Sequence, residues 1–182
     1  MTAAPHSLRP SARADAGRIL KVNHAGEHGA VHIYAGQLLI ARLKAAALTA
    51  ELAEFKSHEE RHRAIFAQEL DRRGLRKCRS FWLCAVGGYT LGIMSGLLGE
   101  QAVATTTVAV ERVVLRHLQQ QLAELGGSDP AATTAILHIL EDEQRHHDLS
   151  AHRLTKPNLL CRILDRIVAG ATEAVIWLGM RI

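Results

Sequence analysis

Apolar residues recur along the chain at the three- and four-residue spacing of amphipathic helices. No window alternates apolar and polar residues over the length of a strand between turn signals, so the pattern predicts no sheet. The sequence therefore predicts an all-α protein. We expect its helices over residues 15–43, 49–73, 80–125, 130–154 and 158–180.

Glycine, proline and small polar residues mark where these helices should begin and end. Thr49 is the expected N-cap of the second helix, and Gly74 follows its last turn. The Gly-Gly-Ser-Asp-Pro segment at residues 126–130 can end one helix and begin the next. Residues 1–13 contain two prolines and small polar residues, so we expect a flexible tail there and a single domain over residues 14–182.

Two parts of the chain are apolar enough to meet a membrane. Residues 81–99 carry no charged side chain and are long enough to cross one, although glycines throughout the segment predict a bend or a break. The segment is either a buried core helix or a helix in contact with lipid. The last predicted helix combines an apolar stripe with arginines and Trp177, which is typical of an interfacial helix, and the alternative is a helix packed on the bundle or on another subunit.

Composition narrows the class of partner. The formal net charge of +4 fits nucleic acid or an anionic membrane surface. Only the membrane explains the uncharged segment at residues 81–99, so we expect no nucleic-acid partner. The three cysteines form no Cys-x-x-Cys pair, which argues against a disulfide framework and favours a reducing compartment.

Six candidate metal ligands recur in two equivalent parts of the chain. Each part has a Glu-x-x-His motif, whose i, i+3 spacing puts both side chains on one helix face about one turn apart. Each motif has a further glutamate 32 residues upstream, and the two sets are offset by a constant 84 residues. The six residues are Glu27, Glu59, His62, Glu111, Glu143 and His146.

The position of the turns predicts which of these residues face each other. The midpoint between Glu111 and Glu143 falls inside the Gly-Gly-Ser-Asp-Pro segment, which places the two carboxylates level with each other on antiparallel helices. The midpoint between Glu27 and Glu59 is Leu43, where no glycine or proline marks a turn. That half of the site is therefore placed by analogy with the other half.

Both motifs lie on apolar helix stripes, where carboxylates are costly to bury unless they are neutralised. The stripes supply no lysine or arginine, whereas two divalent cations would offset the charge of about −4 on four glutamates. Two inward glutamates from one helix pair with Glu-x-x-His from the other are the ligand set of ferritin-like di-iron carboxylate bundles. The mixed oxygen and nitrogen set suits iron or manganese better than zinc.

The residues around the candidate ligands form longer motifs. These motifs resemble the demethoxyubiquinone hydroxylase family of ubiquinone biosynthesis, and the resemblance extends over about residues 18–182. They are Val-Asn-His-Ala-Gly-Glu-His-Gly-Ala at 22–30, Ile-Tyr-Ala-Gly-Gln at 33–37, Leu-Leu-Gly at 97–99, Thr-Val-Ala-Val-Glu at 107–111 and Asp-Glu-Gln-Arg-His-His-Asp at 142–148.

The resemblance implies that the six residues hold two iron ions, with Glu59 and Glu143 bridging them. It also implies O2 as co-substrate, hydroxylation of the ring of a polyprenylated demethoxyubiquinol, and NADH or the quinol itself as electron donor. Two positions depart from the family pattern: Asn23 stands where many members carry Asp, and Leu118 where some carry Tyr. His117 is the candidate to support the metal ligands without binding metal.

We therefore expect a ferritin-like, peripherally membrane-associated di-iron monooxygenase. The absence of a recognisable transit peptide favours the cytoplasmic face of a bacterial cell membrane, and the location in a eukaryote would be the inner mitochondrial membrane. A lipid-presenting accessory protein and a homo-oligomer are candidate partners. The alternatives are a ferritin-like ferroxidase or iron-binding protein and a non-catalytic membrane assembly protein; iron storage would need a hydrophilic exterior, which the long apolar stretches do not provide.

Overall fold

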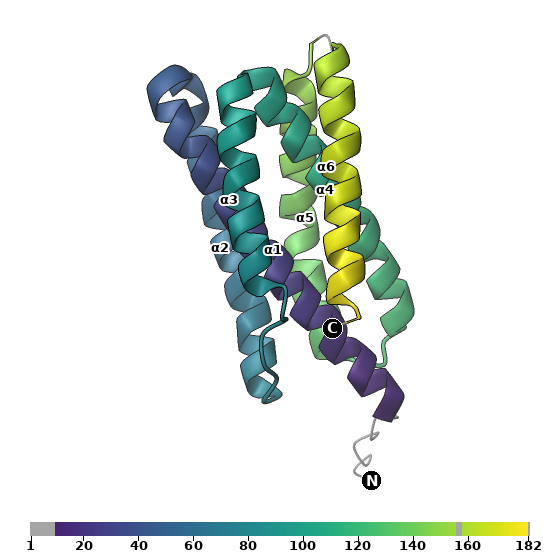
Figure 1. The fold of residues 1–182 in the computed structure, drawn as a ribbon. Coiled ribbons are helices and arrows are strands. Elements are labelled where there is room, and N and C mark those ends of the chain that lie inside the picture. The colour runs from purple at the N-terminus through teal and green to yellow at the C-terminus, as the bar shows by residue number, and fades with distance from the viewer. Residues whose placement is uncertain (1–9, 156–157, 182) are drawn as a thin grey trace.

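The computed structural model describes residues 10–155 and 158–181 (Figure 1). Within these ranges the chain forms helices joined by short connections and contains no strand, which confirms the all-α prediction. The helices are α1 (Pro10–Lys44), a short 3-10 helix η1 (Ala46–Leu48), α2 (Thr49–Arg72), α3 (Phe81–Leu98), α4 (Glu100–Leu125), α5 (Pro130–Arg153) and α6 (Leu159–Gly179).

Four of the helices form a bundle, and the other two pack on its outside. In the bundle α1 pairs with α2, α4 pairs with α5, and α2 also meets α5; α3 lies along α1 and α6 along α4 (Figure 1). One apolar cluster in the bundle interior includes Ile19, Phe66, Leu118 and Ile136, one residue from each of the four helices. A second apolar cluster includes Tyr34, Phe55 and Val103. In α1, α2 and α4 these two clusters lie on opposite sides, along the chain, of the residues that are candidate ligands.

The predicted third helix is divided in two. Gly99 separates α3 from α4 with a backbone φ of +98°, a conformation that favours glycine, so the predicted break within the glycines is confirmed. Its amide still donates to the carbonyl of Gly96, and its carbonyl accepts from Ala102 and Val103. The turn therefore uses no connecting residue besides Gly99 itself.

One predicted helix start and one predicted N-cap differ from the structure. The first helix begins at Pro10, before the expected residue 15, and residues 1–9 of the predicted tail lie outside the described residues. Helix α2 begins at Thr49 as expected, but Thr49 is not its N-cap: Leu48 occupies that position and no side chain caps the helix. The Thr49 hydroxyl donates to the carbonyl of Ala46 in η1. At the later turn, Asp129 does cap α5 by accepting from the amide of Ala132.

Helix α3 packs backbone against backbone on α1. A Cβ atom added to Gly92 would overlap the carbonyl oxygen of Ile33, and one added to Gly36 would lie 2.6 Å from the carbonyl oxygen of Tyr89. The glycines of the apolar segment thus allow the two helices to approach closely.

The other side of α3 is open. Only 33% of the segment Phe81–Leu98 is buried, and Trp82 is 71% exposed, so α3 is not the buried core helix that was one of the two expectations. Among the described helices, it alone is long and apolar enough to cross a membrane.

Candidate metal centre

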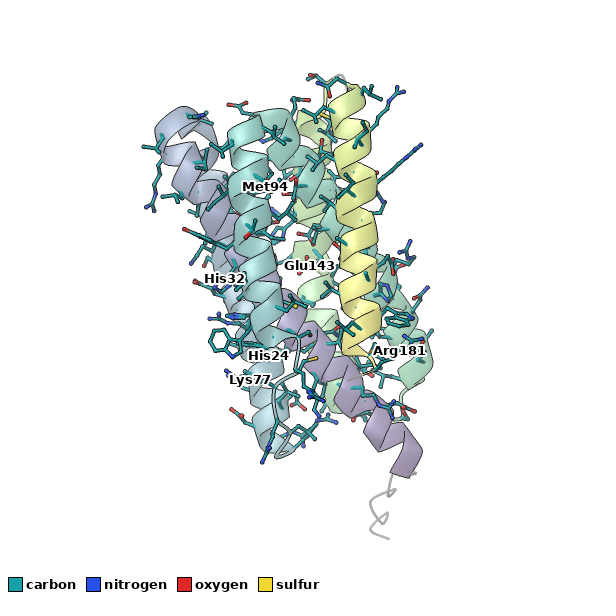
Figure 2. All side chains as sticks on the ribbon, in the orientation of Figure 1. His24, His32, Lys77, Met94, Glu143 and Arg181 are labelled. Carbon is teal, nitrogen blue, oxygen red and sulfur yellow. The ribbon has the colours of Figure 1, made fainter. Side chains whose placement is uncertain are left out.

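The bundle brings the six predicted residues together in its interior. Glu27 comes from α1, Glu59 and His62 from α2, and Glu111 from α4, while α5 supplies Glu143 and His146. Figure 2 shows Glu143 on α5, in line with the space between α3 and α6. The ligand atoms form two groups, within each of which all atoms lie within 4.8 Å of one another: Glu27, Glu59, His62 and Glu143, and Glu59, Glu111, Glu143 and His146.

The two groups share Glu59 and Glu143, which therefore lie between two positions that could each hold an ion. His62 Nδ1 approaches Glu143 Oε1 at 2.9 Å, and His146 Nδ1 approaches Glu59 Oε1 at 3.0 Å, without the geometry of a hydrogen bond. Both imidazoles thus present Nδ1 to the shared carboxylates. The arrangement repeats about the centre of the bundle, as the repeat in the sequence does.

The facing atoms of the site lack partners. None of the six residues is more than 5% exposed. Both carboxylate oxygens of Glu59, one of Glu143 and the Nδ1 atoms of both histidines are buried with no hydrogen-bond partner. In the described part of the chain, the ion-pair partners of Glu27, Glu59 and Glu143 are histidines, never lysine or arginine. Such atoms are costly to bury alone, and this donor set fits two divalent cations.

The electrostatics of the site lead to the same requirement for positive charge. Burial, reinforced by neighbouring carboxylates, raises the pKa of Glu27 and of Glu143 to about 8. Burial also raises the pKa of Glu111 well above its usual value, and the charge of Glu143 raises it further. Burial therefore opposes four ionised glutamates at once, so bound cations would stabilise the ionised carboxylates and release protons.

Tyr34 belongs to the site, although the sequence reasoning did not select it. Its hydroxyl donates to Glu111 Oε1 at 2.9 Å, and burial raises the pKa of Tyr34 so that the phenol stays protonated. Tyr34 follows Glu27 by seven residues, which is two helical turns, so the spacing could have placed both on the same face of α1.

Two further residues contact the histidines from behind. Asp142 Oδ2 lies 3.1 Å from His62 Nε2, and His58 Nδ1 lies 3.0 Å from His146 Nε2. Each of these residues immediately precedes the glutamate of one motif and contacts the histidine of the other motif. That reciprocal position is visible in the sequence only once the two motif helices are known to face each other.

The remaining predicted positions lie outside the site. His117 is half-buried, and its Nε2 lies 2.9 Å from Glu173 Oε2 of α6, so its described contact is not with any of the six residues. Leu118 lies in the apolar cluster with Phe66. Asn23 exchanges two hydrogen bonds with Gln121, of 2.7 and 3.1 Å, joining α1 to α4. An aspartate at position 23 would lack the donor that this reciprocal pair requires.

Comparison with known proteins supplies the family. The family model described as ubiquinone biosynthesis protein COQ7 matches residues 14–179. The chain belongs to the COQ7 family. A relative from Dictyostelium discoideum, named NADPH-dependent 3-demethoxyubiquinone 3-hydroxylase, mitochondrial, is 34% identical over 175 residues, which cover 91% of this chain and 76% of the relative.

Bacterial relatives carry a related name. Proteins from Rhodospirillum rubrum and Variovorax paradoxus, each named 3-demethoxyubiquinol 3-hydroxylase, are 30% and 32% identical to the chain. The matches cover 95% and 94% of the chain and 81% and 84% of the relatives. The resemblance to the demethoxyubiquinone hydroxylase family is therefore confirmed, and the relatives carry the names of hydroxylases in this pathway. The Dictyostelium name specifies NADPH, whereas NADH was the nicotinamide donor expected from the resemblance.

Proposed function

We propose that this protein is a di-iron monooxygenase that hydroxylates the ring of a polyprenylated demethoxyubiquinol with O2. The observation that carries the proposal is the pair of buried ligand groups sharing Glu59 and Glu143, in a chain of the COQ7 family. The donor set of four carboxylates and two imidazoles suits iron or manganese. The names of the relatives support the quinol as substrate and a reduced nicotinamide as electron donor.

Different residues of the chain would bind the metals, orient the ligands and exclude water from the site. Glu27 and His62 would hold one iron, Glu111 and His146 the other, and the two shared glutamates would bridge them. Bound iron would supply electrons and Lewis acidity for the reaction with O2. Tyr34 keeps its proton and holds Glu111 in place. The apolar clusters along the bundle on either side of the site exclude water from it.

An apolar cluster next to the site offers a route for the isoprenoid tail of the proposed substrate. Ile33 of α1, Leu91 of α3 and Val110 of α4 belong to one cluster with Val168 of α6. Val110 immediately precedes Glu111, so the cluster extends from the two outer helices to a ligand of the site. We propose that the isoprenoid tail enters between α3 and α6 and leaves the quinol ring near the metals.

The outer helices also supply a surface for lipid. The end of α3 and the start of α6 lie at the same end of the bundle (Figure 1) and expose large apolar side chains there. Exposed Arg162 and Arg166 lie on the same part of α6 and would face anionic headgroups. We propose peripheral binding to the cytoplasmic face of a bacterial membrane, or to the inner mitochondrial membrane in a eukaryote. The apolar residues are Met94, Leu97, Leu98, Leu159, Leu160 and Ile163.

One reaction tests the proposed chemistry. The protein is loaded anaerobically with Fe(II), mixed with a demethoxyquinol and exposed to labelled O2. A product that has gained one labelled oxygen atom supports the proposal. Stoichiometric zinc in the purified protein, or no iron bound after anaerobic loading, would rule the mechanism out. A ferroxidase would oxidise added Fe(II) and leave the quinol unchanged, and an assembly protein would bind the quinol without turnover.

Vesicle flotation tests the membrane surface. The substitution Leu97→Glu should reduce binding to vesicles that contain anionic lipid, because it adds a charge where lipid contact is proposed. Leu137→Glu on α5 is the matched control, since Leu137 and Leu97 are 54% and 53% exposed and lie on different helices. Equal loss of flotation in the two variants would contradict the proposed surface.

A further inference from the structure

The two histidines of the site are supported from behind by chemically different groups. Behind His62 stands the carboxylate of Asp142, at 3.1 Å, and behind His146 stands the imidazole of His58, at 3.0 Å. In both cases Nδ1 faces the glutamates and has no hydrogen-bond partner. The site is thus symmetric in the atoms that face the metals and asymmetric in the atoms behind them.

Metal binding through Nδ1 determines where each ring carries its hydrogen. The remaining hydrogen is then on Nε2, which donates to Asp142 in one ring and to His58 in the other. His58 must accept through Nδ1, which also lies 3.4 Å from Asp142 Oδ1. It carries its own hydrogen on Nε2, the atom that lies 3.9 Å from Glu54 Oε1. His58 acts as a neutral acceptor in this arrangement, whereas Asp142 acts as an anionic one.

We propose that the two metal positions differ in affinity and that Asp142 and His58 set the difference. The proposal rests on the proposed function, because it requires two metal ions. The Asp142-backed position, formed with Glu27 and His62, binds the first ion. The His58-backed position, formed with Glu111 and His146, binds the second ion more weakly. Asp142 and His58 are positioning residues, since neither touches the metals.

The physical reason lies in the strength of the acceptor. A carboxylate behind an imidazole attracts the ring hydrogen, fixes the ring orientation and makes the opposite nitrogen a stronger ligand. A neutral imidazole forms a weaker hydrogen bond than a charged acceptor and has a smaller effect. Tyr34 acts in the same direction, because its hydroxyl donates to Glu111 Oε1 at 2.9 Å and withdraws charge from that ligand. Both effects weaken the His58-backed position.

A metal titration measures the affinities of the two positions and does not depend on catalytic turnover. Anaerobic addition of Co(II) to the metal-free full-length protein, followed by visible absorption and calorimetry, should show two ions binding in two steps. Two steps alone do not establish the proposal, because repulsion between ions that share two glutamates would separate the steps even at identical positions. Variants of the supporting residues therefore decide the question.

Each variant should change the affinity of one of the two Co(II)-binding steps. Asp142→Asn should weaken the first step by about 10- to 100-fold, the usual effect of losing such a partner. His58→Gln should leave the first step unchanged and weaken the second. His58→Asp, which places a carboxylate behind His146, should tighten the second step and change its Co(II) spectrum. The control Glu141→Gln removes one negative charge from the exposed neighbour of Asp142 and should move neither step.

The outcomes separate the inference from the function. Wild-type protein that binds fewer than two Co(II) ions would contradict the proposed function itself. Two bound ions together with an Asp142→Asn titration identical to the Glu141→Gln control would overturn the inference alone. A first step that responds to His58→Gln, or a second step that does not respond to His58→Asp, would also overturn it. Thermal unfolding of each metal-free variant verifies that the bundle has formed.

Discussion

The two helical hairpins of the bundle present equivalent ligands but are built differently. The α4–α5 hairpin turns at Gly126, whose φ is +51°. Asp129 caps the following helix and pairs with Arg73, the residue immediately after α2. The α1–α2 hairpin turns through η1 with neither a glycine nor a side-chain cap. Helix α1 is supported instead by close backbone contact with α3. The ligand pattern is repeated in the chain, whereas the structure that holds it in place is not.

The largest effect should come from comparing a shared glutamate with an unshared one. Glu143→Ala removes a ligand from both positions, so metal content should fall from about two ions per chain to near zero and turnover should be lost. Glu27→Ala affects one position and should leave about one ion per chain. Metal analysis after anaerobic loading measures both. If the two variants retained equal amounts of metal, Glu143 would not be a shared ligand.

The glycine contact of the first hairpin should be the next most sensitive feature. Gly92→Ala places a Cβ against the backbone of Ile33, and overpacking of this kind costs about 1–3 kcal/mol of unfolding free energy. Gly87→Ala on the same helix meets nothing within 4 Å and should be neutral or stabilise the protein by up to about 1 kcal/mol, as alanine favours helix. Denaturant unfolding compares the two. Equal stabilities would mean that α3 can shift away from α1 at little cost.

The cap of the second hairpin should contribute less, and its contribution should depend on pH. Asp129→Ala removes both the cap and the ion pair with Arg73, at a cost of about 1–2 kcal/mol. The hydrogen bond from Arg73 lowers the pKa of Asp129, so the folded pKa lies below the unfolded one. This contribution is complete above the unfolded pKa of about 4 and is lost as pH falls through the folded value.

Unfolding of Asp129→Ala and wild type as a function of pH measures this contribution. The difference in their stability should shrink below about pH 4. A difference that stayed constant down to the acid transition would assign the effect to packing rather than to charge.

The smallest effect is expected at the turn of the first hairpin. Thr49 does not cap α2, and its side chain bonds only to the carbonyl of Ala46, at an exposed position. Thr49→Ala should therefore change the unfolding free energy by less than about 0.5 kcal/mol, the usual range for surface substitutions. A loss as large as that of Asp129→Ala would show that the two turns are capped alike after all.

The sequence was sufficient for the features that depend on local spacing. The Glu-x-x-His motifs, the Gly-Gly-Ser-Asp-Pro turn and the midpoint between Glu111 and Glu143 depend on helical geometry alone, and the structure has this hairpin. The first hairpin lacked a turn signal, because a 3-10 helix of ordinary residues makes the turn. Only the repeat and the family resemblance placed Glu27.

The features that sequence reasoning missed depend on contacts between helices. Asp142 and His58 become partners of the histidines only when the rotation of α2 against α5 is known. The exposure of α3 depends on which helices cover it, and composition cannot distinguish a covered helix from an open one. His117 was the reasonable choice from motif position, but its side chain meets α6.

The backbone contact between α1 and α3 has a consequence for which substitutions the protein can accept during evolution. The glycines fix which residues of α3 face α1, and residues such as Trp82 and Val86 are left exposed on the outer face. Substitutions on the outer face can adapt the protein to another surface while the interior is retained. The outer face of α3 can therefore change with the surface it contacts, while the face packed on α1 stays the same.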